Sequence, residues 1–421
     1  MKIADLVSTL TEGTPPVRFT AYDGSSFGDE DAEFTLELRN ERGLRYLLTT
    51  PGDLGLARAY VGGDLVLRGA HPANPYLALK RLGAWRFRRP SAADVAALVS
   101  GLGWRKLVPP SPPAQEYLPR WRRAVEGMRH SRTRDAHVIG KHYDVSNRFY
   151  ELVLGPTMAY TCAVFPKPDA SLEQAQDEKF DLVARKLGLE RGMRLLDVGC
   201  GWGGMSRHAA KHYGVTAVGV TLSGEQAKWG QEAVEREGLS GQVQILHGDY
   251  RDAPGAGYDA ISSIGLMEHI GVRNYASYFE LLKSKLRDGG RLLNHCITRP
   301  DNKQNPMPGK FIDRYVFPDG ELTGSGRIIT EAQNTGLEVR HEENLREHYA
   351  LTLAQWCANL ERNWEACVAE VGIAVARVWG LYMAGSRLGF ETNTVQLHQV
   401  LAVRLSATGE ASFPLRPTWG S

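Results

Sequence analysis

Four glycines directly follow an apolar run in the stretch Arg194-Leu-Leu-Asp-Val-Gly-Cys-Gly-Trp-Gly-Gly204. The apolar run predicts a β-strand that ends at Asp197, and residues 205–212 predict a helix. Because glycine has no Cβ, the backbone of such a loop can approach a ligand closely, and the first N–H groups of the following helix are free to donate. In an open α/β sheet, ligands bind beyond the carboxyl ends of the strands. The stretch therefore predicts a site for a nucleotide-sized ligand.

The same glycines also fit the Gly-x-Gly-x-x-Gly pattern of dinucleotide-binding loops, with Gly199, Gly201 and Gly204 in the three positions. Two features disfavour a dinucleotide. Asp197 would place a negative charge close to the pyrophosphate, and the acidic residue expected about 20 residues later is missing, because the second strand ends in Gly219-Val-Thr-Leu-Ser-Gly224. A cationic nucleoside without phosphates suits this loop better. The order Asp-x-Gly-x-Gly-x-Gly resembles the S-adenosylmethionine loop of class I methyltransferases.

Other polar side chains recur where the next predicted strands end. Neutral side chains that could bond ribose hydroxyls follow the second strand, and a carboxylate and a phenol that could meet a base follow the third. An acid and a histidine follow the fourth strand, and a histidine and a cysteine lie in the fifth. In chain order these residues are Thr221, Gln226, Asp249, Tyr250, Glu268, His269, His295 and Cys296. A lone histidine or cysteine is more often a packing residue, but their recurrence at successive strand ends favours one shared site.

Several motifs, taken in order, resemble one known family. They are His142-Tyr-Asp144, Tyr160-Thr-Cys-Ala163, Asp197-Val-Gly-Cys-Gly-Trp-Gly203, Gly219-Val-Thr-Leu-Ser223 with Gln226, Glu268-His-Ile-Gly271, Phe311-Ile-Asp-Arg-Tyr-Val-Phe-Pro-Asp-Gly320 and His348-Tyr-Ala-Leu-Thr-Leu-Ala-Gln-Trp356. This set is similar to the cyclopropane-fatty-acyl-phospholipid synthase family, which includes mycolic-acid cyclopropane synthases and fatty-acid methyltransferases. The resemblance covers roughly residues 130–405. The N-terminal part looks like the extra domain of the phospholipid-acting branch.

The resemblance implies transfer of a one-carbon unit from S-adenosylmethionine to the cis double bond of an unsaturated fatty acyl chain in phospholipid. An alkene has no proton to lose before it attacks, so the site must align it with the sulfonium methyl group. Attack leaves a carbocation. Loss of a proton then closes a cyclopropane, or a hydride shift followed by proton loss leads to a 10-methylene-stearoyl-type lipid, which a reductase partner could convert to a methyl branch. The alternative is methylation of a soluble small molecule or a nucleic acid with the same cofactor.

In the family, the base that takes this proton is a bound bicarbonate ion. Carried onto this sequence, its holders are Cys162, Glu268, His295 and Tyr349, with backbone N–H groups near Ile264 and Gly265. Glu268 is expected to accept from the bicarbonate hydroxyl, because a carboxylate would repel a bare dianion, and the other three side chains are expected to donate. Cys162 is expected to be a ligand and not a nucleophile, because a thiolate would compete for the methyl group.

For the cofactor, the resemblance implies close backbone approach in the glycine loop and side-chain contacts around it. The implied residues are Gly199 and Gly201 in the loop with Asp197 beneath it, Tyr160 and Thr161 at the methionine end, Thr221, Leu222 and Gln226 at the ribose, and Asp249 and Tyr250 at the adenine. No metal site is expected, because the five cysteines form no Cys-x-x-Cys pair, and we interpret them as reduced thiols.

These groups need a scaffold, and the chain predicts an α/β fold of the class I methyltransferase type. Predicted strands at 194–200, 215–222, 243–248, 258–265 and 291–297 alternate with helices and indicate a doubly wound, Rossmann-like sheet. Short β-like runs at 17–20, 34–38 and 44–48 indicate a smaller N-terminal α+β domain. We expect an accessory domain for lipid association or dimerisation at 1–107, a linker and basic segment at 108–134, and a catalytic domain at 135–421. Its late helices (351–368 and 371–386) would cover the acyl chain.

The net charge of +2 conceals an asymmetry. Between Lys80 and Arg134 there are 13 Lys and Arg against three Asp and Glu, a net charge of +10, so the rest of the chain carries −8. Such a block suggests an anionic membrane surface or nucleic acid as partner, and no nucleic-acid-reading module accompanies it. No apolar run approaches the ~20 residues of a membrane span, and no signal-peptide pattern is seen. We expect a cytoplasmic, homo-oligomeric protein at the inner face of the membrane.

Overall fold

The computed structural model describes residues 2–88, 103–117 and 145–419, together with residues 91, 93, 94, 96, 100 and 101. The chain forms two compact units: unit 1 comprises Met1–Leu118, Gly309–Pro318 and Trp356–Leu388, and unit 2 comprises Pro119–Pro308, Asp319–Gln355 and Gly389–Ser421. Two segments that the sequence assigned to the catalytic domain thus pack with the N-terminal residues. The basic run 120–134 and the motif His142-Tyr-Asp144 lie outside the described residues.

Unit 2 is built on a seven-stranded sheet with the strand order β12-β13-β11-β10-β7-β8-β9. The strands are β7 (Arg194–Val198), β8 (Thr216–Thr221), β9 (Val243–His247), β10 (Tyr258–Ile264), β11 (Leu286–Thr298), β12 (Leu337–Asn344) and β13 (Gln396–Arg404). The first five run parallel, while β13 runs antiparallel between β11 and β12. The chain order reverses between β7 and β10, which is the switch point where open α/β sheets bind ligands.

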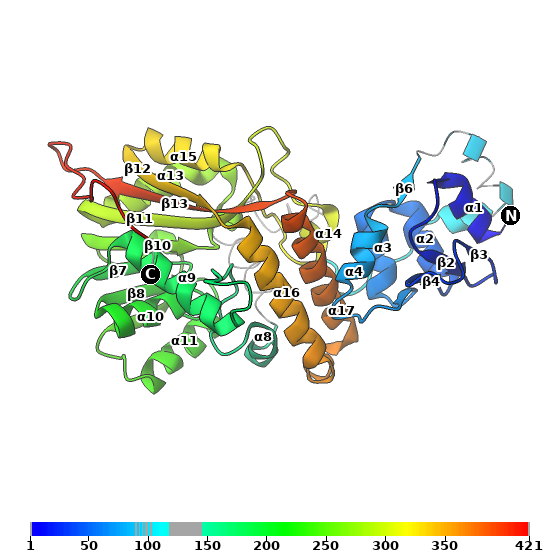
Figure 1. The fold of residues 1–421 in the computed structure, drawn as a ribbon, viewed down its shortest axis with the longest axis horizontal. Coiled ribbons are helices and arrows are strands. Elements are labelled where there is room, and N and C mark those ends of the chain that lie inside the picture. Colours follow the sequence, from blue (N-terminus) through cyan, green and yellow to red (C-terminus); the bar gives the residue numbers. More distant parts are fainter. Residues whose placement is uncertain are drawn as a thin grey trace. The chain divides into compact units, whose positions relative to one another are not determined.

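Helices cover both faces of this sheet, so its strands are buried on both sides (Figure 1). One face is covered by α9 (Leu172–Leu187), α10 (Gly204–Tyr213) and α11 (Gly224–Arg236), and the other by α13 (Tyr275–Lys285) and α15 (Ser325–Asn334). Helix α9 begins with a capping box between Ser171 and Gln174 and ends at Gly188 in the left-handed conformation. Two short helices, α8 (Asn147–Leu154) and α12 (Met267–Ile270), lie near the carboxyl ends of the strands.

Unit 1 contains a four-stranded sheet of order β3-β2-β4-β5 and a two-stranded sheet of β1 and β6. Its strands are β1 (Thr11–Glu12), β2 (Arg18–Ala21), β3 (Ser26–Phe27), β4 (Thr35–Leu38), β5 (Leu65–Arg68) and β6 (Arg86–Phe87). Its helical elements are α1 (Ile3–Leu10), α2 (Glu41–Thr49), α3 (Asp53–Val61), α4 (Tyr76–Leu82), η1 (Trp104–Leu107) and α14 (Lys310–Tyr315). This is the α+β composition that the sequence predicts for the N-terminal part.

One predicted strand in unit 1 is wrong. Residues 44–48 form part of helix α2 and not a strand, because Asn40 caps the helix by accepting from Gly43 N. Leu44, Leu47 and Leu48 follow the i, i+3, i+4 spacing of a helix face and pack on the unit 1 core.

The two late helices are longer than predicted: α16 spans Arg346–Arg362 and α17 spans Trp364–Glu391, with a break at Gly372 (φ 79°). By length and composition, α17 is the one helix among the described residues that could cross a membrane, which corrects the prediction that no apolar run is long enough. Its residues Ala376, Trp379 and Met383 are buried. Of the apolar window of this helix, 39% is buried in the structure.

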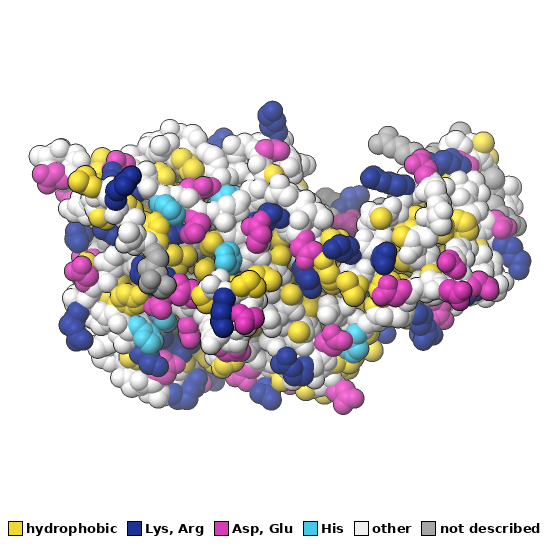
Figure 2. Space-filling model, viewed as in Figure 1, with side chains coloured by type: hydrophobic (Ala, Val, Ile, Leu, Met, Phe, Trp, Pro, Cys, Tyr) yellow, Lys and Arg dark blue, Asp and Glu magenta, His cyan; other side chains and the backbone are white. Residues whose placement is uncertain are grey.

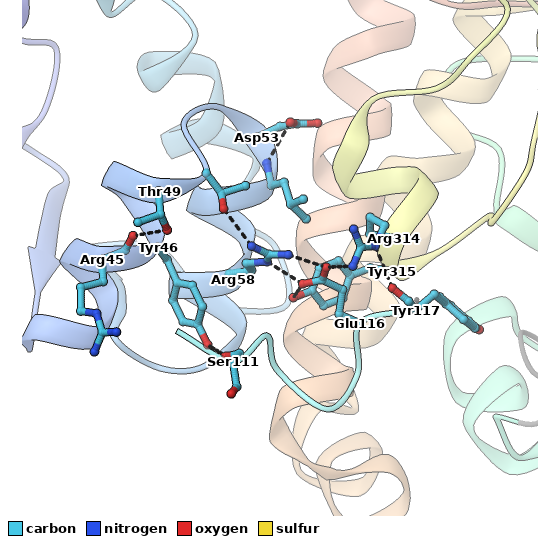
Figure 3. Close-up of polar contacts among 12 residues, drawn as sticks. Arg45, Tyr46, Thr49, Asp53, Arg58, Ser111, Glu116, Tyr117, Arg314 and Tyr315 are labelled. Carbon is cyan, nitrogen blue, oxygen red and sulfur yellow. Dashed lines mark hydrogen bonds and ion pairs between the residues drawn. The ribbon is translucent and has the colours of Figure 1, made fainter. Parts of the chain in front are cut away.

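A buried ion cluster joins three segments of unit 1 (Figure 3). The fully buried Glu116 carboxylate accepts from Arg58 Nε and Nη2 at 2.6 and 2.7 Å, pairs with Arg314, and accepts from the Tyr315 hydroxyl at 3.3 Å. The proline-rich segment before it is also held, since the Tyr46 hydroxyl donates to Ser111 O. The part of the predicted linker that the structure describes is therefore packed on unit 1.

Charges of both signs are mixed over the face of the molecule shown in Figure 2. Of the predicted basic block, several described members pair with acids of unit 1. Arg88 bonds Asp94 at 2.6 Å, Arg81 lies 3.7 Å from Glu33, and Lys106 lies 4.0 Å from Glu41. Seven of the 13 basic residues lie outside the described part of the chain.

Candidate functional site

A cavity of about 900 Å³, including its open mouth, lies at the carboxyl ends of β7, β8 and β10. Many of its lining residues are those predicted for the cofactor site or its neighbourhood: Tyr160, Thr161, Asp197, Gly199, Gly201, Thr221, Leu222, Gln226, Tyr250, Ile264 and Gly265. The structure thus gathers residues that are more than 100 positions apart in the sequence into one wall.

The glycine loop leaves its backbone open to this cavity. Gly199 and Gly201 have φ values of 71° and 56°, which favour glycine. A Cβ on Gly201 would meet no atom within 4 Å, whereas a Cβ on Gly199 would lie 3.0 Å from Leu266 Cβ. Gly201 therefore marks free space beside the backbone, and Gly199 marks a close contact with the opposite wall.

Asp197 lies beneath the loop, as predicted, and is almost completely buried. Its carboxylate accepts from Ser262 Oγ at 2.8 Å and from Ser206 Oγ at 3.0 Å. Burial raises the pKa of Asp197 to about 6, and these two hydrogen bonds and the nearby Lys179 oppose that rise. Above that pH the residue adds a negative charge to the cavity wall, which suits a cationic ligand.

The predicted ribose and adenine contacts differ in their outcome. Thr221 donates to Gln226 Oε1 at 2.8 Å, so the two predicted ribose residues hold each other at the cavity. Tyr250 also lines the cavity, but Asp249 does not. Both Asp249 carboxylate oxygens accept from Arg251, at 2.7 and 2.5 Å. The adenine contact predicted for Asp249 thus has a competing partner within the chain.

Lys179 of α9 was missed as a site residue and lines the cavity. Its side chain is 1% exposed, and its Nζ donates to Thr161 Oγ1 at 3.0 Å. Gln176, one turn earlier, donates to Thr161 O at 2.9 Å, so both side chains hold the same residue. Burial lowers the pKa of Lys179 to about 7. The signal in the sequence was a lysine on the apolar face of an amphipathic helix.

The four side chains predicted to hold an anion lie outside the lining of this cavity, although Cys162 and Glu268 are next to lining residues in the chain. Glu268 precedes the lining residue His269, and its Oε1 accepts from Ile297 N at 2.7 Å. His295 lies on β11, two residues before Ile297. Its carbonyl oxygen accepts from the N–H group of the lining residue Gly265 at 2.8 Å. The structure thus places Glu268 and His295 on adjoining elements beside the cavity.

Each of these two side chains has one buried atom with no hydrogen-bond partner among the described residues. These atoms are Glu268 Oε2 and His295 Nε2. Burial raises the pKa of Glu268 to about 7, and burial, with the charges of Lys179 and Lys186, lowers the pKa of His295 well below its ordinary value. Unpaired buried polar atoms cost roughly 1–3 kcal/mol each, so each of these two atoms is expected to bind water or a ligand.

Cys162 lies beside Leu345, which directly precedes α16, and Tyr349 lies in the first turn of that helix. The Cys162 Sγ lies 3.8 Å from Leu345 O and 3.2 Å from Ala163 O, and Tyr349 N donates to Leu345 O at 3.2 Å. The Tyr349 ring packs on Phe390 with centroids 4.5 Å apart. Burial raises the pKa of Cys162 far above its ordinary value, so the group remains a thiol. No cluster of metal-ligating side chains occurs in the part of the chain that the structure describes.

Comparison with known proteins agrees with this geometry. A family model described as mycolic acid cyclopropane synthetase matches residues 130–400. A probable fatty acid methyltransferase of Mycobacterium tuberculosis is 60% identical over 421 residues, covering 100% of this chain and 98% of the relative. The cyclopropane-fatty-acyl-phospholipid synthase of Escherichia coli is 36% identical over 270 residues, covering 64% of this chain and 68% of that protein.

A solved structure extends the likeness to three dimensions. The mycolic acid cyclopropane synthase CmaA1, complexed with SAH and CTAB, is 33% identical with a TM-score of 0.60, over 63% of this chain and 97% of that chain. SAH is S-adenosylmethionine without its methyl group. The predicted α/β fold of the class I methyltransferase type is confirmed, and the family resemblance found in the sequence is confirmed as well.

Proposed function

Because the chain belongs to the mycolic acid cyclopropane synthetase family, it is an S-adenosylmethionine-dependent methyltransferase of that type, and we propose that it acts on the cis double bond of an unsaturated fatty acyl chain in phospholipid. The observation that supports this proposal best is the pair of buried, unpartnered atoms, Glu268 Oε2 and His295 Nε2, beside the cofactor cavity. A methyltransferase acting on a nucleophile that already carries a lone pair has no need of such an anion site.

S-adenosylmethionine would supply an electrophilic methyl group on a sulfonium centre. The open backbone at Gly201 fits close approach of that cofactor, and Thr221 with Gln226 offers neutral groups for the ribose hydroxyls. Tyr160 and Thr161 lie on the wall of the cavity next to Cys162, which would bring the methionine end toward the anion site. Asp197 would balance the positive charge.

We further propose that a bicarbonate ion binds between Glu268 and His295. Bicarbonate would accept the proton lost from the carbocation. It has one hydroxyl donor and two acceptor oxygens, which matches one unpaired carboxylate oxygen and one unpaired imidazole nitrogen. Cys162 and Tyr349 would complete the site, with backbone N–H groups near Ile264 and Gly265. Because burial keeps Cys162 protonated, it would not compete as a thiolate for the methyl group.

The acceptor is proposed from the relatives. The M. tuberculosis relative is named a probable fatty acid methyltransferase, and the E. coli relative a cyclopropane-fatty-acyl-phospholipid synthase. The carbocation leads either to a cyclopropane or to a methylene lipid, and the latter would need a reductase partner to become a methyl branch. Both products rest on the same site.

We propose that the enzyme works as a homo-oligomer in the cytoplasm, at the inner face of the membrane. In unit 1, the 65% exposed Trp104 is followed by the exposed Arg105, an arrangement that suits an anionic bilayer surface. Each basic residue near such a surface contributes about 1 kcal/mol. Binding to vesicles of oleoyl phosphatidylglycerol should then exceed binding to oleoyl phosphatidylcholine and should weaken with salt.

The test of the proposed reaction uses the full chain, S-adenosylmethionine with a labelled methyl group, and liposomes of oleoyl phospholipid. The expected result is a fatty acid heavier by one CH₂, with hydrogenation separating a ring from a methylene product. Label found in a soluble compound or nucleic acid, and not in the acyl chains, would overturn the proposal. Glu268→Gln should abolish turnover and leave cofactor binding unchanged, and full turnover in that variant would show that the anion site is misassigned.

A further inference from the structure

Three polar side chains form one row across the antiparallel edge of the unit 2 sheet. In the register of the strands, His295 of β11 lies opposite Gln399 of β13, and Gln399 lies opposite Glu343 of β12. Residues directly opposite each other in a sheet project from the same face. That face is covered by α9, from which Lys186 reaches the row. Lys186, Gln399 and His295 are each at most 1% exposed.

The contacts in this row assign its protons, because a lysine ammonium group has donors and no acceptor. Lys186 Nζ lies 2.7 Å from Gln399 Oε1 and forms an ion pair with Glu343. Burial lowers the pKa of Lys186, and the Glu343 carboxylate opposes this shift and favours the charged form. The Gln399 amide is thereby oriented with its oxygen toward Lys186.

The amide nitrogen of Gln399 then faces the histidine. Gln399 Nε2 lies 3.2 Å from His295 Nδ1. An amide nitrogen only donates, so Nδ1 of the ring must accept, and a neutral ring that accepts at Nδ1 carries its proton on Nε2. The Nε2 atom is the buried atom that has no partner among the described residues.

We infer that Lys186 and Gln399 fix His295 as the neutral tautomer that carries its proton on Nε2. The two act through the ring and not on the reacting atoms, so they are positioning residues. Lys179 and Lys186 are the cations that face the ring, and together with burial they keep it neutral. The orientation and the protonation state of the His295 ring are then fixed before a ligand binds.

The inference rests on the proposed function in one respect, the identity of the acceptor. An Nε2–H group donates to an oxygen of a bound anion such as bicarbonate, whereas the other tautomer would present a lone pair and repel that anion. The chain of contacts from Lys186 through Gln399 to His295, the relay, thus favours an anionic ligand over a cationic one at His295 Nε2. It also explains the position of Lys186, one of two buried lysines on the face of α9 that packs on the sheet.

The tautomer can be measured directly by NMR on the full chain with ¹⁵N-labelled histidine rings. The spectrum of His295→Asn identifies the His295 signals. In the unaltered protein, His295 should give the Nε2–H pattern throughout pH 6 to 8.5. Signals of the Nδ1–H tautomer or of a charged ring in that range would overturn the inference.

Gln399→Glu supplies the matched perturbation, because a carboxylate at this position can only accept from Nδ1. His295 should then show a protonated Nδ1, and kcat should fall by about 10–100-fold, as for other partners that orient a ligating histidine. Lys186 lies between the two carboxylates in this variant, which favours folding. Gln396→Glu adds the same charge three residues away on β13 and should leave the His295 signals unchanged. An unchanged tautomer in Gln399→Glu would contradict the relay.

The two proposals fail separately. If His295 shows the Nε2–H pattern and liposomes gain no label, the relay stands and the proposed reaction does not. If liposomes gain label and His295 is the Nδ1–H tautomer, the reaction stands and the relay does not. Titration with bicarbonate should shift the His295 Nε2 signal in the unaltered protein. An unshifted signal would show that His295 Nε2 does not bind bicarbonate.

Discussion

Lys179 Nζ donates a 3.0 Å hydrogen bond to Thr161 Oγ1 from a helix face that is otherwise packed on the sheet. This places a group that titrates near pH 7 on the wall of the cofactor cavity. The titratable groups that act on it are Cys162, Asp197 and Asp177. A cation at this place would repel the sulfonium of S-adenosylmethionine, so the ammonium form opposes cofactor binding and the neutral amine does not.

The affinity for S-adenosylmethionine should therefore rise as the pH rises through about 7. Ionisation of Asp197 near pH 6 adds to the rise, because it gives the wall a negative charge. In Lys179→Met the part centred near pH 7 should disappear and affinity at pH 6 should increase by about tenfold, or ~1.4 kcal/mol. Isothermal titration calorimetry from pH 5.5 to 8.5 measures this.

Two controls accompany that titration. S-adenosylhomocysteine has no sulfonium charge, so Lys179→Met should change its affinity much less. Lys228→Met alters an exposed lysine on α11 and should change neither ligand's affinity. Equal effects of Lys179→Met on both ligands would show that the lysine acts by shape and not by charge.

Glu268→Gln should stabilise the folded protein above pH 7. The pKa of Glu268 is raised from 4.5 to about 7 in the fold, so ionisation is disfavoured there, and the stability it contributes falls as pH rises from about 4.5 through 7. Removing the charge restores at most about 3 kcal/mol. An unpaired amide N–H offsets about 1–2 kcal/mol of that, leaving a net gain on the order of 1 kcal/mol.

Urea unfolding at pH 5 and pH 8 checks this. The difference between Glu268→Gln and the unaltered protein should be larger at pH 8 than at pH 5. A constant difference at both pH values would mean that the carboxylate has a partner in solution and is not buried alone.

Much of the fold could be predicted from the sequence, because short stretches of neighbouring residues determine many of its strands and helices. The apolar runs before Asp197 and Thr221 predicted β7 and β8 to within a few residues, and the glycines after Asp197 predicted the cavity they line. Residues 44–48 were misassigned as a strand because a short apolar run fits both periodicities, and only the Asn40 cap distinguishes them. Strand β12 was not predicted, since its alternating charged residues do not form an apolar run.

The relay to His295 was beyond sequence reasoning for a different reason. Lys186 and Gln399 are 213 positions apart, and their contact depends on the register of β13, which is inserted between β11 and β12 in the sheet. A glutamine in a buried strand and a lysine on an apolar helix face were each visible. Their pairing follows only from the order of the strands.

The ion cluster in unit 1 should be a major source of that unit's stability. Glu116→Gln would leave Arg58 and Arg314, whose side chains are 12% and 13% exposed, without their carboxylate. Breaking a buried pair in this way typically costs about 3–5 kcal/mol. Glu37→Gln, which breaks an exposed pair with Arg68, should cost less than about 1 kcal/mol. Urea unfolding curves of the two variants would contradict this account if their losses were equal.

Gly201→Ala tests whether the open backbone of the loop is the cofactor site. Its φ of 56° costs a side chain about 1–2 kcal/mol, and the added methyl group would project into the cavity. Gly238→Ala is a matched control, because its φ is 70°, its Cβ would also meet nothing within 4 Å, and it lies in an exposed turn after α11. Both variants should lose similar stability, but only Gly201→Ala should weaken binding of S-adenosylhomocysteine, by tenfold or more in calorimetry. Equal affinity of the two variants for S-adenosylhomocysteine would place the cofactor elsewhere. Backbone strain, which both substitutions cause, would then be the only effect of Gly201→Ala.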